Sequence, residues 1–340
     1  MHQNASPKLK NSDVTLKDIA EAVGKSVAAV SRALNNYDDI SPETKEYIKR
    51  VAREMGYAPT DTLGFVLPAL SPRYSDPYYS ELLAGITSKA TGQGFDLLVS
   101  TCAPGPEEDW AYLRLINSRR VDGIILARPR WRDARIELLL EKSFPFAVVG
   151  TTNMAGDFLT VSEDESAGIS LIVEHLVQQG HTSIALVNAP ANLFSSANYL
   201  AGFRDAMQKA NLIVNEDLLE ISDFTQKGGY NVAQTLLSKP KAPTAIITTD
   251  DVVALGVMAA VQDQGLEIGS DILVTGYGDT LLAEYAQPPL TTVHRPTYML
   301  GQQACQMLTT RLSGEAVDNT NVVLHPSLVI RQSSNLALWL

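Results

Sequence analysis

Cysteine and long apolar runs are scarce in this 340-residue sequence. The two cysteines, Cys102 and Cys305, are too few and too far apart in the chain for a disulfide framework or a zinc cluster. No stretch approaches the roughly 20 consecutive apolar residues that cross a bilayer, and the polar first residues lack the apolar segment of a secretory signal. We therefore expect a cytoplasmic protein that does not associate with a membrane.

The common motifs for catalysis and phosphate binding are absent as well. The chain has no His-Glu-x-x-His pair, no Gly-x-Ser-x-Gly turn, no P-loop and no glycine fingerprint after a strand. Its five histidines are scattered along the sequence. These absences predict a protein that is not an enzyme and that needs neither a cofactor nor a metal.

Charge is distributed unevenly along the chain. The first 60 residues contain nine Lys or Arg and eight Asp or Glu, so the net charge of −11 comes from the remainder. We divide the chain into an N-terminal module (residues 1–59), a short linker (60–62) and an acidic body (63–340). A near-neutral module permits contact with nucleic-acid phosphates but does not establish it.

Three short helices are predicted in the module. The first has apolar residues at helical spacing between Leu16 and Val23, with Thr15 placed to cap it and Gly24 placed to end it. Three residues separate it from a second helix over residues 27–34. There we expect Val27, Val30 and Leu34 on the buried side. A third helix is expected from Pro42 to about Met55, behind the capping residue Ser41.

Two helices joined by so short a glycine turn are typical of a helix-turn-helix. In that motif the second helix lies in the major groove of DNA, where an arginine reads guanine and small apolar side chains contact the thymine methyl. Arg32 is the one long donor at this place in the sequence. The predicted DNA-binding residues are Thr15, Ser26, Val27, Ala28, Ala29, Ser31, Arg32 and Asn35.

Four short sequence motifs of the module resemble those of a known protein family. The elements T-x-K-D-x-A, V-S-R-x-L-N, S-P-E-T and G-Y-x-P follow one another in the order found in the headpiece of the lactose-repressor (LacI) family of bacterial transcription regulators. This resemblance implies binding to double-stranded operator DNA by a homodimer, which could assemble further.

The body alternates short apolar runs with longer amphipathic stretches, in two successive series. This pattern predicts βαβ units, parallel sheets and two lobes. The body also resembles the two-lobed α/β effector domain of the same family, which is similar to the periplasmic sugar-binding proteins (type I). By that resemblance the chain crosses between lobes near residues 150–161, 287–293 and 318–323, and a small effector binds between the lobes.

Aromatic and acidic side chains at strand ends are the expected effector ligands. The loop after the first strand carries several of them, although Tyr78 and Tyr79 could simply pack as the next helix begins. Asp250 is the better ligand candidate of the Asp250–Asp251 pair, because a structural role as a helix cap would be enough to explain Asp251. The predicted effector-binding residues are Tyr74, Asp76, Tyr78, Tyr79, Tyr199, Phe224, Asp250 and Asp279.

Two positions in that set depart from the family pattern. Tyr199 stands where the family often has an arginine, and Gly278 leaves Asp279 alone where two aspartates are usual. Without the arginine no fixed guanidinium would meet an anionic effector. We therefore favour a neutral sugar or glycoside over a purine, which the aromatic side chains could also stack against.

The linker is the third departure. The family inserts a longer hinge here, including a helix that wedges a leucine into the minor groove and kinks the DNA. Residues 60–62 leave no room for such a helix, so we expect little bending of the DNA. Either the headpieces bind without the wedge, or another element replaces it, or the sequence lacks a segment.

The favoured interpretation is an effector-controlled transcription repressor. Two alternatives remain from the residues alone. One is a cytoplasmic sugar-binding sensor without selective operator binding, suggested by the missing hinge. The other is a glycosidase that uses Asp250 and Asp251, which is disfavoured because adjacent residues at a helix start rarely face one bond from opposite sides.

Overall fold

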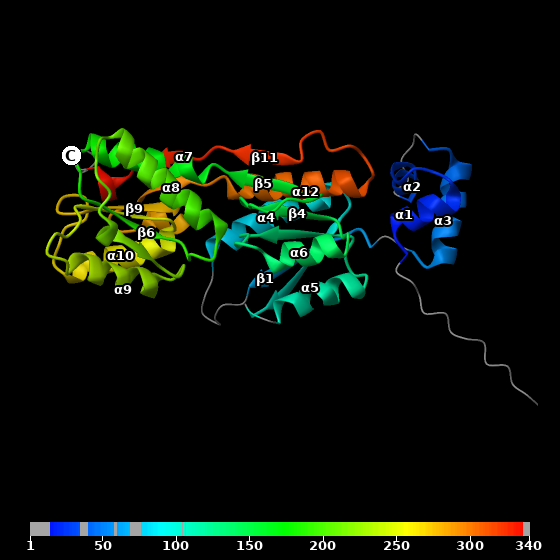
Figure 1. The fold of residues 1–340 in the computed structure, drawn as a ribbon, viewed down its shortest axis with the longest axis horizontal. Coiled ribbons are helices and arrows are strands. Elements are labelled where there is room, and N and C mark those ends of the chain that lie inside the picture. The colour runs from blue at the N-terminus through cyan, green and yellow to red at the C-terminus, as the bar shows by residue number, and fades with distance from the viewer. Residues whose placement is uncertain are drawn as a thin grey trace, which may run out of the picture.

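The computed structural model describes residues 14–34, 40–57, 60–68, 76–103, 105 and 107–335. Two predicted site residues, Asn35 and Tyr74, lie outside the described residues. Within them no helix is both long enough and apolar enough to span a membrane. The module and the two lobes of the body follow one another along the long axis of the molecule (Figure 1).

The module contains the three expected helices, α1 (Leu16–Val23), α2 (Val27–Leu34) and α3 (Pro42–Met55). Thr15 caps α1 in a reciprocal pair with Asp18, and Gly24 ends it with φ 64°. This left-handed conformation is the one that glycine adopts without cost.

The small core of the module differs in one residue from the expectation. Ile19, Val30, Ala33 and Ile48 are fully buried in it, whereas Val27 is 41% exposed. The predicted stripe through Val27 was therefore wrong. Val27 lies at the first turn of α2, where it lines a cavity between the module and the body.

The first lobe is a parallel six-stranded sheet with helices on both faces. Its strand order is β11-β5-β4-β3-β1-β2. The strands are β1 (Thr62–Pro68), β2 (Asp96–Cys102), β3 (Gly123–Ala127), β4 (Phe146–Val149), β5 (Leu159–Glu163) and β11 (Asn321–Leu324). One face packs against α4 (Pro77–Gly92) and α12 (Thr297–Leu312), the other against α5 (Glu108–Asn117) and α6 (Ala134–Glu141).

The second lobe repeats this architecture with strand order β12-β10-β9-β8-β6-β7. Its strands are β6 (Ile184–Asn188), β7 (Leu219–Ile221), β8 (Ala245–Thr248), β9 (Leu273–Gly278), β10 (Thr291–His294) and the antiparallel edge strand β12 (Ser327–Val329). Its helices are α7 (Glu165–Gln178), α8 (Phe194–Lys209), α9 (Gln226–Leu237), α10 (Asp251–Asp263) and the short α11 (Leu281–Tyr285). Two 3-10 turns cover Glu216–Leu218 and Gln332–Ser334.

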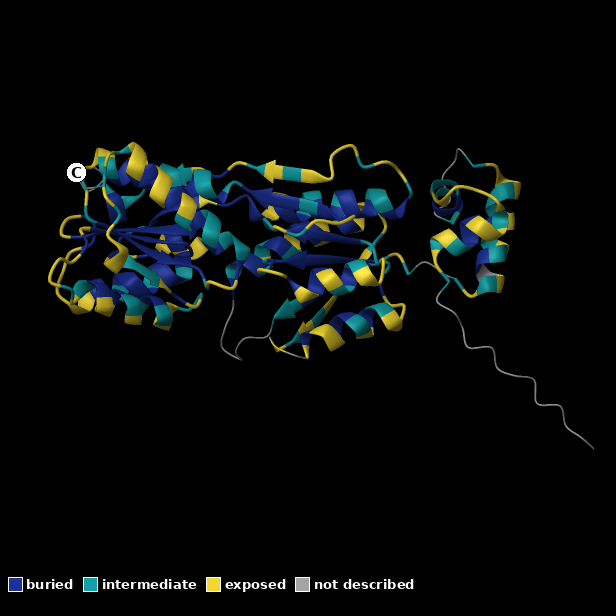
Figure 2. Cartoon of the chain, in the orientation of Figure 1, coloured by how far each residue is buried: buried dark blue, intermediate teal, exposed yellow. Residues whose placement is uncertain are grey.

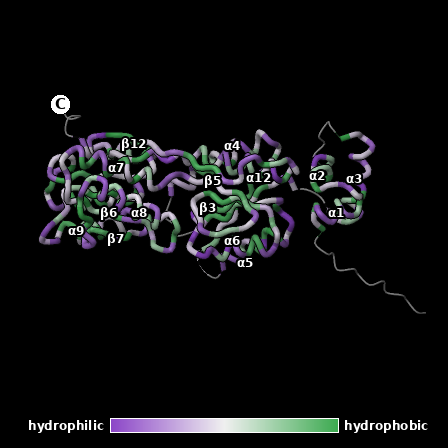
Figure 3. Tube along the Cα trace, turned by 45° about the horizontal axis from the view of Figure 1, so that its top comes forward, coloured by the Kyte–Doolittle hydropathy of each residue, from purple (hydrophilic) through white to green (hydrophobic). Residues whose placement is uncertain are grey.

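Burial explains why these strands read as continuous apolar runs. Every residue of β3, β4, β6 and β8 is buried, because helices cover both faces of each sheet (Figure 2). The most hydrophobic segments of the chain, such as β3 and β6, accordingly lie inside the lobes (Figure 3). The expected fold class, a helical module followed by a two-lobed α/β body, is confirmed.

The three crossings between lobes lie slightly later in the chain than expected. They fall after β5, after β10 and after β11, at residues 164, 295–296 and 325–326. The expected positions were early because the strand that precedes each crossing still pairs within the sheet that the chain is leaving.

The separate core of the module predicts a local effect of mutation there. Replacing the fully buried Ile48 with Ala should lower the free energy of unfolding of the module by about 2 to 5 kcal/mol, since it leaves a cavity. Glu46→Ala, on the exposed side of the same helix, should change it by less than about 0.5 kcal/mol. Hydrogen exchange of the α1–α3 amides measures both effects, and equal exchange in the two variants would contradict the prediction.

Candidate functional site

Helix α2 begins with its side chains at the surface of the module. Ser26 caps the helix by accepting a hydrogen bond from the Ala29 amide (3.1 Å). Ser26 and Val27 are exposed, as is Thr15, and Ala28, Ala29 and Arg32 are half-buried. Ser31 is the exception among the described residues predicted to bind DNA, because it is 1% exposed and faces the body.

The linker is anchored to the body rather than folded into a helix. The amide of Thr60 donates to Asp122 (2.9 Å to Oδ2), and Arg119 donates to the carbonyl of Gly56 (2.9 Å). Of residues 56–61, those that the structure describes contain no helix. Thr62, which the prediction placed in the linker, is the first residue of β1, and Thr60 and Asp61 precede it without a helix.

The centre of the interlobe region is the guanidinium group of Arg128, which follows β3. Its carbon lies 4.1 Å from the ring centroid of Phe224, 4.5 Å from that of Tyr78 and 5.0 Å from that of Tyr79. Its Nη1 forms an ion pair with Asp76 (2.5 Å). Four predicted effector residues from both lobes therefore meet around one cation.

Tyr78 and Tyr79 occupy the first turn of α4, and both are less than 10% exposed. They pack edge to face with each other, at 5.2 Å between ring centroids. They therefore pack as the helix begins, and they also surround the interlobe cation. Their role in effector binding stays a prediction.

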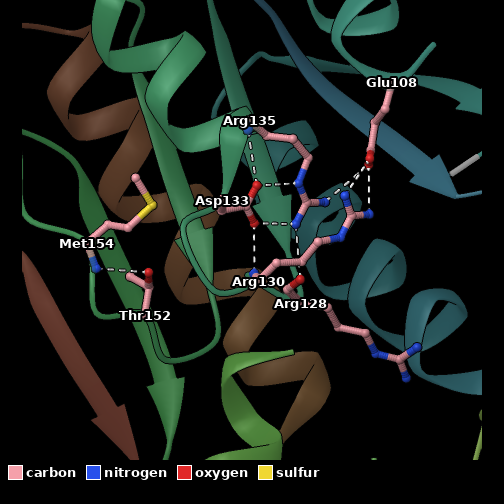
Figure 4. A network of polar contacts seen from close by, with 7 residues as sticks. All are labelled: Glu108, Arg128, Arg130, Asp133, Arg135, Thr152 and Met154. Atoms are coloured by element: carbon pink, nitrogen blue, oxygen red, sulfur yellow. Dashed lines mark hydrogen bonds and ion pairs between the residues drawn. The ribbon is translucent and has the colours of Figure 1, made fainter. Parts of the chain in front are cut away.

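A network of ion pairs holds the backbone on which Arg128 sits. Arg130 donates to Glu108 through both of its terminal nitrogens (2.6 and 3.2 Å), and Arg135 donates to Asp133 through Nε and Nη2 (2.8 and 2.6 Å). Arg135 also donates to the carbonyl of Arg128 (3.0 Å). Figure 4 shows the Arg128 side chain pointing away from this network. The network therefore stabilises the backbone of Arg128, whose φ is 50°, and leaves its guanidinium for the interlobe region.

A second buried cation, Arg295, follows β10. It forms an ion pair with Glu163 (2.8 Å) and donates to the hydroxyl of Tyr199 (2.8 Å). It also lies 5.0 Å from the ring centroid of Tyr277. The premise that no fixed guanidinium faces the effector was therefore wrong, because Arg128 and Arg295 both lie between the lobes.

Asp250, and not Asp251 as considered from the sequence, caps α10, while Asp251 has a different structural role. Asp250 caps α10 by accepting from the Val252 amide (2.8 Å). Asp251 accepts from the Thr280 amide (2.7 Å) and from Thr292 (2.6 Å), and so joins three segments of the lobe. Burial, and then the charge of Asp76, raise the pKa of Asp250 to about 7.

Asp279 is occupied by other partners. One of its carboxylate oxygens accepts from Arg331 (2.7 Å) and the other contacts His294 (3.1 Å). It makes no described contact with Arg128 or Arg295, so the structure does not bring it to the other predicted effector residues.

The two lobes also touch through their backbones. Phe194 donates to the Pro129 carbonyl (3.0 Å) and Trp131 donates to the Asn192 carbonyl (3.1 Å). The rings of Trp131 and Phe194 are 4.5 Å apart. This pairing bridges the cleft between the lobes, and the structure therefore shows them closed.

A cavity of about 580 Å³ lies beside the crossings, between β5 and α8. Glu163, the partner of Arg295, lines it, as do Thr152 and Met154 of the loop labelled in Figure 4. Glu165 spans it, because it accepts from Thr151 of the first lobe (2.9 Å) and from Asn198 of the second (3.1 Å). Burial, and then the nearby Glu163, raise the pKa of Glu165 to about 7.

Three residues of the interlobe region were missed from the sequence: Arg128, Arg295 and Glu163. Each is the last residue of a strand or follows it directly. Ligands in such sheets bind beyond the carboxyl ends of strands, so this position was the available signal. Among the described residues, no group of three or more His, Cys, Asp or Glu is arranged to hold a metal ion.

Comparison with known proteins decides the family. Residues 15–60 match the model described as "Bacterial regulatory proteins, lacI family", and residues 173–334 match a periplasmic binding protein-like domain. The HTH-type transcriptional repressor CytR of Escherichia coli K12 is 30% identical over 341 residues, covering 96% of this chain and 98% of CytR. The chain belongs to the lacI family of bacterial regulatory proteins.

Other members of the lacI family agree with this assignment. The repressor PurR of Erwinia tasmaniensis is 29% identical, with 94% of this chain and 96% of PurR covered. The regulator CelR, solved as a cellobiose complex, has a TM-score of 0.76 at 27% identity, with 94% and 100% of the two chains covered. The lac repressor dimer bound to operator has a TM-score of 0.72 at 28% identity, with 95% and 100% covered.

The lacI-family chain is therefore a DNA-binding transcriptional repressor and not an enzyme. The alternative in which Asp250 and Asp251 cleave a glycoside is excluded by this family, and by the separate structural roles of the two carboxylates.

The raised pKa of Glu165 predicts a pH-dependent stability. In the folded protein the carboxyl of Glu165 stays protonated up to a pKa of about 7, whereas its ordinary pKa is 4.5. As the pH rises from 4.5 to 7, this difference lowers the free energy of unfolding by up to about 3 kcal/mol. Glu165→Gln removes this cost, and its free energy of unfolding relative to the original protein should rise as the pH increases from 4.5 to 7. Urea unfolding at several pH values measures it, with the exposed Glu174→Gln of the same helix as control. The same pH dependence in both variants would contradict the assignment.

Proposed function

We propose that this protein is a homodimeric repressor that reads its operator with α2 and releases or tightens it in response to a small molecule bound between the lobes. The proposed DNA contacts are those predicted from the sequence, with Arg32 as the base-reading side chain. Support comes from the observed helix-turn-helix, in which an eight-residue α2 follows a tight glycine turn. A homodimer matches the two half-sites of a palindromic operator.

Helices α4 and α12 are the proposed dimer surface. They pack tightly on each other, since a Cβ at Gly85 would lie 2.1 Å from the Tyr298 carbonyl oxygen. On the outer side, Tyr298 and Met299 of α12 are 38% and 56% exposed. An exposed apolar patch beside a rigid helix pair is suited to association with a second copy.

The proposed effector is a neutral sugar or glycoside, and the interlobe cluster of charges carries this proposal. Arg128 and Arg295 face three carboxyl groups, those of Asp76, Glu163 and Asp250. Because the carboxyl groups outnumber the arginines, an anionic effector would be repelled. The hydroxyl groups of a sugar can both donate hydrogen bonds to the carboxylates and accept them from the arginines.

One arginine nitrogen is available for such a ligand. Nη2 of Arg128 is buried and has no hydrogen-bond partner among the described residues. A buried donor without a partner is costly, and a ligand oxygen would satisfy it. The surrounding rings of Tyr78, Tyr79 and Phe224 are suited to stacking on a sugar face. The similar regulator CelR was solved with cellobiose.

One alternative from the sequence is retained, in which the effector is a purine that stacks on the same rings. The other, a sugar-binding sensor without selective operator binding, does not agree with the assignment to a family of DNA-binding repressors. Anisotropy on DNA from the upstream region of the gene against scrambled DNA, over a salt series and with sugars and purines, separates these possibilities.

Arg32 should carry base selectivity. Arg32→Ala is expected to weaken binding to the selected DNA by about 1 to 3 kcal/mol and to relax the preference at one base pair. Arg204→Ala removes the same charge from α8 in the second lobe and should leave the affinity unchanged. Anisotropy titrations against base-substituted duplexes measure both effects. Retained selectivity in Arg32→Ala would show that Arg32 does not read a base pair.

Asp250 should select hydroxyl donors. Asp250→Asn keeps an N-cap residue on α10 but removes the carboxylate, and should weaken binding of the neutral sugar found in the screen by about tenfold. The loss should be larger at pH 8 than at pH 6, since the pKa of Asp250 is about 7. Calorimetry measures it, with Asp263→Asn at the other end of α10 as control. Unchanged affinity at pH 8 would remove Asp250 from the site.

A further inference from the structure

The face of α2 that is proposed to read DNA lies against the body of the same chain. Ser31 is 1% exposed, and its hydroxyl donates to the carbonyl of Leu312, the last residue of α12. The last carbonyls of a helix need partners from outside that helix, and Ser31 supplies one.

The approach at this point is close. Gly314 has φ 74°, and a Cβ there would lie 2.5 Å from the Cα of Ala28 and 3.1 Å from the Cβ of Ser31. A side chain at position 314 is thus excluded both by the backbone conformation and by the backbone of α2. Glycine at this position permits the contact.

We propose that residues 312–314, the last residue of α12 and the two that follow it, are a docking surface for α2, and that docking and operator binding exclude each other. This inference rests on the proposed role of α2 in reading DNA. Ala28 and Ser31 cannot contact base edges while they contact α12, because the same atoms would have to meet both surfaces.

The linker makes this docking intramolecular. Thr60 is bound to Asp122, and the Gly56 carbonyl is bound to Arg119, so the module is held beside the body. A short tether gives its two ends a high effective concentration, and a small contact surface is then enough to keep them together.

The junction is also incompletely packed, which allows release. A cavity of about 540 Å³ lies between the two parts, lined by Leu16 and Val27 of the module and by Phe95 and Phe144 of the body. Protein cores rarely contain voids larger than a water molecule, so the module is not fused to the body by a continuous core.

Helix α12 connects this surface to the effector site. It begins two residues after Arg295, which lies in the interlobe cluster, and ends at Leu312. Its 16 residues span about 24 Å as a rigid rod. An effector that displaces Arg295 can thereby change the position of the docking surface, and DNA binding affects effector affinity by the same coupling free energy.

Gly314→Ala tests the proposal, with Gly180→Ala as the matched control. Gly180 follows the C-cap of α7 and has φ 88°, and a Cβ there meets nothing within 4 Å, so the control adds similar backbone strain without touching another segment. We expect Gly314→Ala to bind the duplex selected by the original protein about 3- to 10-fold more tightly than Gly180→Ala. Hydrogen exchange of residues 26–34 should be faster in Gly314→Ala. Equal affinities, or faster exchange without tighter binding, would overturn the proposal.

Hydrogen exchange of the original protein provides the second arm, which needs no side chain at position 314. If docking and operator binding exclude each other, the selected duplex should make residues 312–317 exchange faster than scrambled DNA does, because α2 no longer covers them. Residues 176–181 at the end of α7 serve as the control segment. Unchanged exchange of residues 312–317 in the presence of the selected duplex would refute mutual exclusion. Absence of selective binding in the original protein would refute the proposed function instead, while hydrogen exchange would still test docking.

Discussion

The body of this protein depends on burying two arginine side chains between its lobes. A buried charge is costly unless it is paired and hydrogen-bonded. Arg128 meets this requirement through Asp76, and Arg295 through Glu163 and Tyr199. Arg128 also contacts Phe224 of the other lobe, so the closed arrangement places an aromatic ring of the second lobe against this paired charge.

This constraint explains why the effector site is built from residues that already have partners. The closed lobes satisfy most donors and acceptors internally, and the backbone pairing of residues 129–131 with residues 192–194 adds to the closure. A ligand must therefore exchange these contacts for its own, and its effect on the lobes comes from the difference between the two sets. The position of Arg295 next to α12 extends that exchange to the end of the body that faces the module.

Local sequence patterns predicted the elements well. Helix α1 begins after Thr15 and ends at Gly24, as expected, and the buried strands β3, β6 and β8 coincide with the apolar runs. Patterns of this kind work because capping and two-sided burial depend on neighbouring residues in the chain. The expected crossings were early by several residues. The local sequence pattern does not show that β5 pairs with the distant β11, or β10 with the distant β12.

The sequence by itself determined the family, the helix-turn-helix, the two-lobed architecture and most of the residues that surround the interlobe cation. Tertiary structure alone decided the partners of the charged groups: that Arg128 stands between the aromatic rings, that Asp250 rather than Asp251 caps α10, and that Asp279 is taken by Arg331. It also decided that Ser31 of α2 faces the end of α12, 281 positions away in the chain. The physical reason is that an ion pair or a close backbone approach depends on geometry between segments far apart in sequence, and residue types along the chain do not specify that geometry.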